Sequence, residues 1–224
     1  MATENSPTTN SQIETENLDD FLFHSIDFAY RKKKLLITIG VIFVLAFIIW
    51  FLAYKYLEYQ EDSRNNQLYQ VEKIIFDQKL VPAERDQAAL KAIKSFVAEN
   101  RGSKQANIAL FHEAKIYFHQ SELDLAATSY QKILSNLDRN SSFYVIASIY
   151  LANVLKDQKK PDQAIEVLNA AKTENMYDVI LMELAETYHS INDKPSAKKT
   201  LENLIADFPS SNYTQRAKEM LSQY

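Results

Sequence analysis

The longest apolar stretch of the chain runs from Leu35 to Tyr54 and contains no charged residue. Fourteen of its 20 residues are Leu, Ile, Val or Phe. As a helix, a stretch of this length is about 30 Å long, which matches the hydrocarbon thickness of a bilayer. The pattern therefore predicts a single transmembrane helix over residues 35–54, and a buried helix of a water-soluble core is the less favoured alternative.

Basic residues mark one flank of this stretch and indicate its orientation. Arg31, Lys32, Lys33 and Lys34 directly precede it, whereas the few cations that follow it are mixed with acidic residues. Positively charged flanks remain in the cytoplasm, so we expect the N-terminus inside and everything after Tyr54 outside. A cleaved signal peptide is the competing interpretation. The stretch is longer than a signal-peptide core and no small-x-small site follows it, so we expect a retained signal anchor.

The segment before the span divides into two parts. Residues 1–17 are polar and acidic, and we expect a disordered cytoplasmic tail there. In residues 18–34, apolar positions recur at helical spacing before the basic stop, which predicts a short amphipathic helix along the inner membrane face. Such a helix either docks a cytoplasmic or membrane partner or only steadies the span, and the second interpretation is favoured.

After the span, the pattern becomes that of a helical domain in water. Residues 55–67 are charged and predict a linker helix that continues the span. Leu68 to Leu80 has helical apolar spacing, and we expect Pro82 to stop this helix. Glu84 to Glu99 resumes the helical pattern, and residues 100–103 predict a C-cap and turn.

Three later segments repeat one spacing of small and large residues. Intervals of three, nine, four and three residues separate the members of each set: Ala114, Tyr117, Ala126, Tyr130, Ile133; Ala152, Leu155, Ala164, Leu168, Ala171; Ala185, Tyr188, Ala197, Leu201, Leu204. The step between sets is 38 and then 33 residues. Such a ladder predicts stacked helical hairpins, because small residues let two helices approach and large ones fill the space to the next hairpin. Pro161 and Pro195 then lie in the first turn of a second helix.

This ladder resembles the tetratricopeptide repeat, a helical hairpin of about 34 residues. The resemblance implies a domain at 68–224, with a degenerate repeat at 68–104, repeats at about 107–140, 145–176 and 178–209, and a cap at 210–224. We assign the extra residues of the longer first step to the turn around Asp138–Ser142, and Met176 stands where the repeat usually has proline. Ser210 or Ser211 is expected to cap a last helix over Tyr213–Gln223. The expected fold class is therefore all-α: an N-terminal transmembrane helix followed by a tetratricopeptide-repeat helical-hairpin solenoid.

The composition narrows the classes of function. The chain has no cysteine and only two glycines, which excludes disulfides and Cys-based chemistry and disfavours nucleotide-binding loops. Residues 65–224 carry 19 basic and 20 acidic side chains, a balance that disfavours nucleic acid as a partner. His112 and His119 lie seven residues apart without a third candidate ligand, and no catalytic motif is present. We therefore expect no enzyme activity, no cofactor, no metal site and no small-molecule substrate.

In this repeat class, the first helix of each hairpin lines a concave groove. At those register positions the sequence predicts a partner-binding groove formed by Ile108, Phe111, Lys115, Phe118, His119, Ile146, Ile149, Asn153, Lys156, Val179, Met182, Glu186 and His189. Asn153 and two lysines are too few for capture of a chain terminus, so an apolar groove for an amphipathic or unfolded segment is favoured. The alternative is that the protein's own helix, Leu68–Leu80 or Glu84–Glu99, fills the groove.

The whole layout resembles a second, more specific family. An acidic tail, a basic stop, one anchor and a short repeat domain with the phrase FVAENRGSKQANIALFHEAKIYF are similar to the YfgM-like family. The resemblance implies a single-pass protein of the bacterial inner membrane, with its N-terminus in the cytoplasm and its repeat domain in the periplasm. It also implies an ancillary role at the Sec translocon, with protein partners: Sec translocon subunits, periplasmic chaperones or secreted clients. The alternative is a structural scaffold subunit of another cell-envelope assembly, which holds one dedicated partner helix.

Overall fold

The computed structural model describes residues 30–173 and 176–224. The tail expected at 1–17 and most of the amphipathic segment expected at 18–34 lie outside the described residues. The described part of the chain consists of helices and turns without a strand, and it divides into two compact units with the boundary after Glu61. The all-α prediction is confirmed.

The first described helix, α2 (Lys33–Ile75), is 43 residues long. It includes the whole span expected at 35–54 and the linker helix expected at 55–67. Among the described residues, α2 is the one helix that is long and apolar enough, by length and composition, to cross a membrane.

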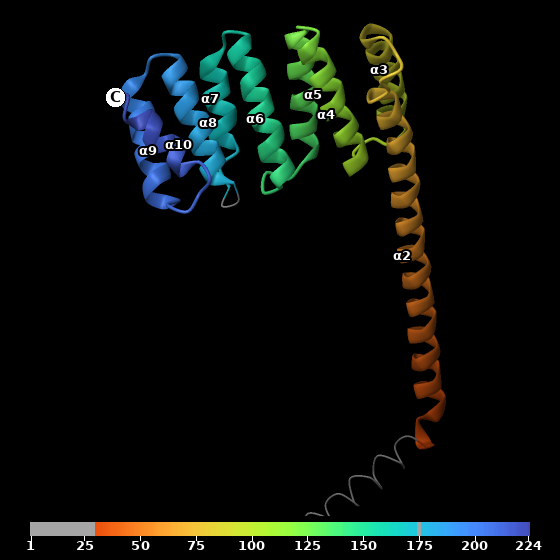
Figure 1. Cartoon of the computed structure of the whole chain (residues 1–224). Coiled ribbons are helices and arrows are strands. Elements are labelled where there is room, and N and C mark those ends of the chain that lie inside the picture. Colours follow the sequence, from red (N-terminus) through yellow and green to blue (C-terminus); the bar gives the residue numbers. More distant parts are fainter. Residues whose placement is uncertain (1–29, 174–175) are drawn as a thin grey trace, which may run out of the picture. The chain divides into compact units, whose positions relative to one another are not determined.

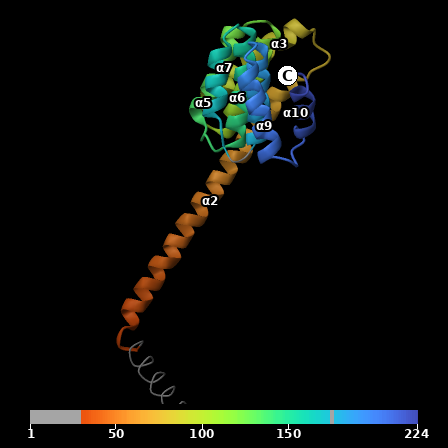
Figure 2. The same ribbon diagram turned by 90° about the vertical axis from the view of Figure 1, so that its left-hand side faces the viewer.

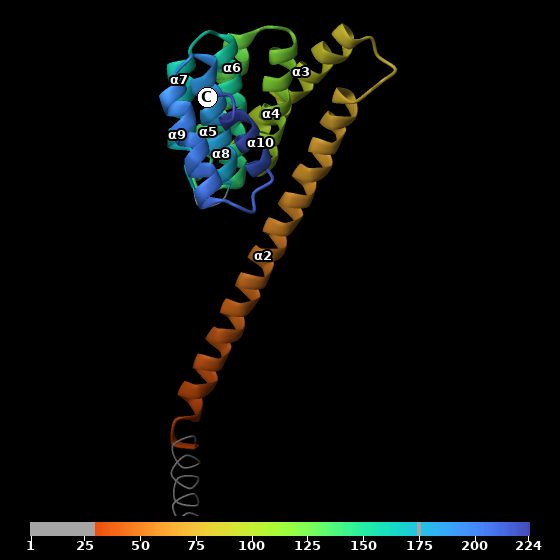
Figure 3. The ribbon, with the colours of Figure 1, turned by 60° about the vertical axis from the view of Figure 1, so that its left-hand side comes forward.

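The helix expected at Leu68–Leu80 is shorter in the structure, because α2 ends at Ile75 and residues 76–81 form an open loop (Figure 3). The Asp77 carboxylate accepts a hydrogen bond from the backbone N–H of Lys79 at 2.8 Å, and this local bond replaces a helical one. Pro82 begins the next helix, α3 (Pro82–Glu99), where its missing N–H costs little. The prediction that Pro82 stops the preceding helix is therefore wrong.

The remaining helices form a stack of hairpins in chain order (Figure 1). The pairs are α4 (Lys104–His119) with α5 (Leu123–Asn136), α6 (Ser142–Asp157) with α7 (Pro161–Ala170), and α8 (Tyr177–Ser190) with α9 (Lys194–Asp207). Seen from the C-terminal end, α9 and α10 (Thr214–Leu221) lie in front of the earlier hairpins (Figure 2). The helix α10 packs on α9 and closes this end of the stack.

The small residues of the predicted ladder lie in the interior of the hairpins. Six alanines are completely buried, at 0% exposure: Ala114, Ala126, Ala152, Ala164, Ala185 and Ala197. Tyr130, Leu168 and Leu201, four residues after the second alanine of each pair, are at most 1% exposed. Because the interior is close-packed, a larger side chain at any of the six alanine positions would push helices apart.

Each hairpin turn holds one residue in the left-handed region of backbone conformation. Ser121, Lys159 and Asn192 have φ values of 62°, 60° and 63°. Each donates its N–H to the carbonyl three residues earlier at 3.0 Å, and the next residue donates to the carbonyl five residues before it at 2.8–2.9 Å. These paired bonds are the Schellman motif, in which glycine is the usual left-handed residue because it has no Cβ. The three positions are 38 and 33 residues apart, which are the steps of the repeat.

Proline positions follow the repeat as the pattern predicts. Pro161 and Pro195 lie in the first turns of α7 and α9. The connection between α5 and α6 has only five residues, 137–141, whereas α5 has 14 residues and α7 has 10. The longer first step therefore lies in α5, and the prediction that its extra residues form the turn around Asp138–Ser142 is wrong. Met176, which replaces a proline of the repeat pattern, is the N-cap residue of α8 and has a left-handed backbone with φ 63°.

The start of α10 differs from the expectation. Tyr213 is its N-cap residue and makes no side-chain capping bond. The Ser211 hydroxyl instead accepts a hydrogen bond from the Tyr213 N–H at 3.1 Å and donates one to the Asp178 carboxylate at 2.5 Å. The prediction that Ser210 or Ser211 caps this helix is therefore wrong, because Ser211 ties the loop before α10 to the start of α8.

Candidate functional site

Side chains of the first helices of successive hairpins contact one another along the stack. Lys156 of α6 approaches Glu183 of α8, with Nζ and Oε2 3.5 Å apart. At the N-terminal end of the stack, Glu72 near the end of α2 lies 3.5 Å from Nε2 of His112 in α4. At the C-terminal end, Glu186 of α8 pairs with Arg216 of α10 at 2.6 Å. Polar side chains, with a carboxylate in each pair, therefore bridge these three junctions.

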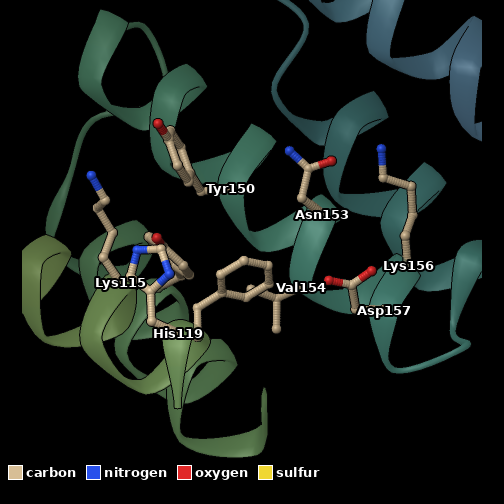
Figure 4. Close-up of a pocket in the computed structure, with 9 residues that line it drawn as sticks. Lys115, His119, Tyr150, Asn153, Val154, Lys156 and Asp157 are labelled. Atoms are coloured by element: carbon tan, nitrogen blue, oxygen red, sulfur yellow. The ribbon is translucent and has the colours of Figure 1, made fainter. Parts of the chain in front are cut away.

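The junction between α4 and α6 is different, because aromatic rings meet there beside a cavity. A cavity of about 450 Å³, called the first hollow below, is lined by Lys115, Phe118, His119, Tyr130, Tyr150, Asn153, Val154, Lys156 and Asp157. Figure 4 shows Lys115 and His119 on one side of it and Asn153, Lys156 and Asp157 on the other. The helices α4 and α6 supply its two walls, and Tyr130 of α5 lies between them.

Aromatic rings form the floor of the first hollow. The Phe111 ring lies at the centre of the group, with its centroid 4.8 Å from that of Tyr150, 5.5 Å from that of Tyr130 and 5.7 Å from that of Phe143. Tyr130 and Tyr150 are 5.9 Å apart. Edge-to-face and tilted pairs of this kind are favourable beyond their buried area, so the floor is rigid and apolar. Tyr150 remains 39% exposed and presents its ring to a bound group.

The polar groups around the hollow carry both signs of charge. Burial raises the pKa of the Tyr130 hydroxyl above its usual value, with a smaller contribution from Tyr150, so Tyr130 is a neutral hydrogen-bonding group. On the α6 side, burial raises the pKa of the Glu183 carboxyl, while Lys156 at 3.5 Å opposes the shift. Lys156 is thus engaged with an acid, whereas Lys115 has no carboxylate partner in the part of the chain that the structure describes. A partner segment that carries an apolar side chain next to a hydrogen-bonding or acidic residue would fit this arrangement.

Five of the predicted groove residues come together in the first hollow: Lys115, Phe118, His119, Asn153 and Lys156. Phe111 does not line the hollow but packs against two residues that do, Tyr130 and Tyr150. Sequence reasoning missed Tyr130, Tyr150, Val154 and Asp157 as lining residues. Tyr130 appeared in the repeat ladder as a packing residue, and Tyr150 lies one helical turn before Asn153, so register could have found both.

The other predicted groove residues lie elsewhere. Ile108, Ile146, Ile149 and Val179 line none of the cavities described here. Glu186 and His189 line a separate cavity of about 320 Å³ with residues of α10, where His189 Nδ1 is 2.7 Å from the Tyr224 hydroxyl. Met182 is 2% exposed and packs in a cluster with Ala217 of α10. Its prediction as a groove residue is wrong, because the C-terminal helix buries it.

The protein's own N-terminal helices do not fill the first hollow. Leu68 and Val71 of α2, together with Ile93 and Phe96 of α3, are buried in the main hydrophobic core. All residues that line the hollow come from α4, α5 and α6. The lining of the first hollow therefore gives no support to the alternative in which Leu68–Leu80 or Glu84–Glu99 occupies the groove. Ile75 and Phe76 instead line a separate cavity, together with Lys115 and His119.

The histidines take part in packing contacts. His112 meets Glu72 and, edge to face, the ring of Phe76 at 5.7 Å. Within the described residues, no group of three or more His, Cys, Asp and Glu side chains could hold a metal ion.

Comparison with known proteins gives a family and a fold. The tetratricopeptide repeat-like domain family matches residues 30–185, and a tetratricopeptide repeat matches residues 180–211. No curated protein matches the chain.

Among solved structures, a putative kinesin light chain of Podosopora anserina with nearly identical TPR-like repeats is 14% identical, with a TM-score of 0.50 over 71% of this chain and 91% of that one. The MamA protein is 18% identical, with a TM-score of 0.50 over 71% of this chain and 86% of that one. At such identities the similarity shows the fold alone.

Proposed function

The chain belongs to the tetratricopeptide repeat-like domain family and is a protein–protein interaction module, and we propose that the N-terminal part of α2 holds it in a membrane. We propose further that partners bind at the first hollow, and the observation that carries this part is the hollow itself, a cavity of about 450 Å³ between the first helices of two hairpins. Concave sites of this kind, with an apolar floor and a few polar groups, are typical of binding sites.

The membrane anchor is supported by length, composition and the extent of the family. Residues 35–54 form about 30 Å of uncharged helix within α2. The family match starts at residue 30 and so includes this stretch. Tethering raises the effective concentration of a binding site at the membrane surface, which allows a site of modest affinity to act.

The proposed orientation places the repeat domain on the extracytoplasmic side. It is supported by Arg31, Lys32, Lys33 and Lys34 before the apolar stretch. This orientation and the resemblance of the sequence layout to the YfgM-like family together support a more specific proposal. The protein is an ancillary subunit of the Sec translocon in a bacterial inner membrane, and its groove meets translocated proteins or periplasmic chaperones.

Site-specific photocrosslinking in intact cells tests the partner. A photoreactive phenylalanine analogue at Tyr150 or Asn153 faces the first hollow, and the same analogue at Glu166, an exposed position of α7, is the matched control. We expect crosslinks to Sec subunits, secreted proteins or periplasmic chaperones from the hollow positions and not from the control. Crosslinks to one dedicated envelope protein at fixed stoichiometry, unchanged when secretion is blocked, would instead establish the scaffold alternative.

Protease accessibility tests the orientation. Added to spheroplasts, a protease is expected to digest the domain after residue 62, whereas the domain is protected in inverted vesicles. The reverse pattern would place the hollow in the cytoplasm and would remove the translocon proposal, while leaving the interaction module itself intact.

A further inference from the structure

A second cavity lies beside the first hollow, on the other side of α4. This second hollow has a volume of about 500 Å³, and its apolar lining consists of Ile75, Phe76, Pro82 and Ile116. These residues come from the end of α2, the open loop 76–81, the start of α3 and the middle of α4. Phe76 is 63% exposed, so the apolar lining is accessible from outside.

The two hollows share a wall. Lys115 and His119 line both of them, and they lie one helical turn apart on the exposed face of α4. Figure 4 shows the two side chains next to each other at the edge of the first hollow. We call this pair the ridge, and the two hollows with the ridge between them the trough.

The ridge carries the positive charge of Lys115. Near it, Arg85 is paired with Asp86 at 3.3 Å, and the His112 ring lies 3.5 Å from Glu72. Lys156, at the far side of the first hollow, is paired with Glu183. For Lys115 and His119, the described residues offer no carboxylate within ion-pair distance.

We propose that the trough binds an acidic segment of a partner protein, with a carboxylate at the ridge and one apolar side chain in each hollow. The proposal rests on the proposed function and specifies the chemistry of its partner. A charge-assisted hydrogen bond from Lys115 and a hydrogen bond from a ring N–H of His119 hold the carboxylate. The aromatic rings of the first hollow and Phe76 in the second take the flanking side chains.

Charge distribution favours a peptide over an anionic membrane or a nucleic acid. Asp86 lines the second hollow and Asp157 lines the first, one on each side of the ridge. A continuous anionic surface would meet both carboxylates, whereas a single carboxylate at the ridge avoids them. The trough therefore fits an isolated acidic position within an apolar segment.

Binding of short synthetic peptides to the full chain in nanodiscs of neutral lipid tests the proposal. The probe is a fluorescent peptide with a single acidic residue, Ser-Gly-Phe-Ser-Glu-Leu-Gly-Ser, measured by fluorescence anisotropy against the same peptide with Gln in place of Glu. We expect the acidic probe to bind at least about fivefold more tightly than the amide probe, with a preference that shrinks at high salt. Equal or weaker binding of the acidic probe overturns the proposal.

Three variants then distinguish binding across the whole trough from binding in the first hollow alone. Lys115→Gln should weaken binding of the acidic probe about fivefold and leave binding of the amide probe unchanged. Lys104→Gln, on the same helix away from the trough, is the matched control and should change neither affinity. Phe76→Ser should weaken both probes about threefold, and Tyr150→Ala should do the same. Phe76 and Lys115 are exposed, so folding is retained.

Each remaining outcome has a defined meaning. If Tyr150→Ala weakens the probes but Lys115→Gln and Phe76→Ser do not, the interaction site stands and the trough is overturned. If none of the three variants changes binding, both the trough and the first hollow as partner site are overturned. Displacement of the acidic probe by soluble dihexanoyl phosphatidylglycerol, lost with Lys115→Gln, would assign the ridge to a lipid headgroup and overturn the peptide proposal.

Discussion

The ring of Phe111 in α4 meets the ring of Tyr150 in α6 edge to face, with centroids 4.8 Å apart and planes inclined at 77°. This contact joins two hairpins at the junction where the first hollow opens. At the next junction along the chain, the ion pair between Lys156 and Glu183 takes the corresponding place. The same ring contact therefore joins two hairpins and supports Tyr150, which lines the candidate site.

Removing both rings should cost less than the sum of the two single losses. In a double-mutant cycle of Phe111→Ala and Tyr150→Ala, we expect a coupling of about 0.5–1.5 kcal/mol in the free energy of unfolding, measured by urea denaturation. Phe111→Ala combined with Tyr213→Ala, near α10, is the control and should be additive. Additivity in the first cycle would show that the ring contact contributes nothing to stability.

Glycine at the hairpin turns should stabilise the protein. Ser121 and Lys159 hold a left-handed backbone that is strained for residues with a Cβ. Ser121→Gly and Lys159→Gly should each raise the free energy of unfolding by up to about 1 kcal/mol, after the entropy that glycine adds to the unfolded chain. Thermal unfolding measures the change. Gln158→Gly, next to the turn but with φ −70°, is the control and should lower stability.

A buried hydrogen bond between α4 and α5 should be sensitive to the loss of one partner. The Ser129 hydroxyl donates to the Glu113 carboxylate at 2.7 Å, and both residues are at most 9% exposed. Ser129→Ala leaves that carboxylate without its donor, and we expect a loss of about 1–3 kcal/mol in the free energy of unfolding. Ser135→Ala, at an exposed hydroxyl that bonds to its own helix, should change stability by less than about 0.5 kcal/mol. Similar losses for both variants would contradict this account.

Stability should fall in mild acid because of His112. Burial lowers the pKa of the His112 imidazole below its usual value, and the Glu72 carboxylate opposes that shift. The unfolded chain then binds the proton more readily, so the stability present above a pH of about 6.5 is lost as pH falls toward the lowered pKa. Urea denaturation at pH 7.5 and pH 5.5 should show a smaller drop for His112→Gln than for the wild type.

The Glu72→Gln variant gives the second arm of this test. Without the opposing carboxylate, the pKa of His112 should fall further, and nuclear magnetic resonance titration of the imidazole measures it directly. An unchanged or higher pKa of His112 in this variant would contradict the assignment of Glu72 as the opposing charge.

The periodic spacing of small and large residues was sufficient to predict the helical hairpins, because close helix packing depends on side-chain size at fixed intervals. All seven alanines of the ladder are buried, and Pro161 and Pro195 lie where a helix can begin with proline. The left-handed turns escaped prediction, because Ser121, Lys159 and Asn192 stand where glycine is the usual signal. The end of α2 was misplaced for a similar reason, since a local bond of Asp77 and not the proline decides it.

The candidate site was only half predictable. Repeat register identifies which helix is expected to face the groove, and three of the residues it selected, Lys115, Asn153 and Lys156, line one cavity in the structure. Register does not reveal which junctions are closed by side chains from the neighbouring helix. Met182 and Glu186 were assigned to an open groove, but contacts with α10 occupy both. Such contacts depend on the three-dimensional path of the last residues, which follows no repeat.

The last turns of α2 also determine where the domain could be severed from its N-terminal segment. Leu68 and Val71 are buried in the main core, and Asn65 accepts a hydrogen bond from Gln105 of α4 at 2.7 Å. A protease that cuts after these residues would release a fragment whose hydrophobic core is exposed at its N-terminal end, and this fragment should aggregate. A cut before Asn65 would release the whole stack of helices with its core covered. Solubility of fragments that begin at residues 62 and 76 would distinguish the two cases.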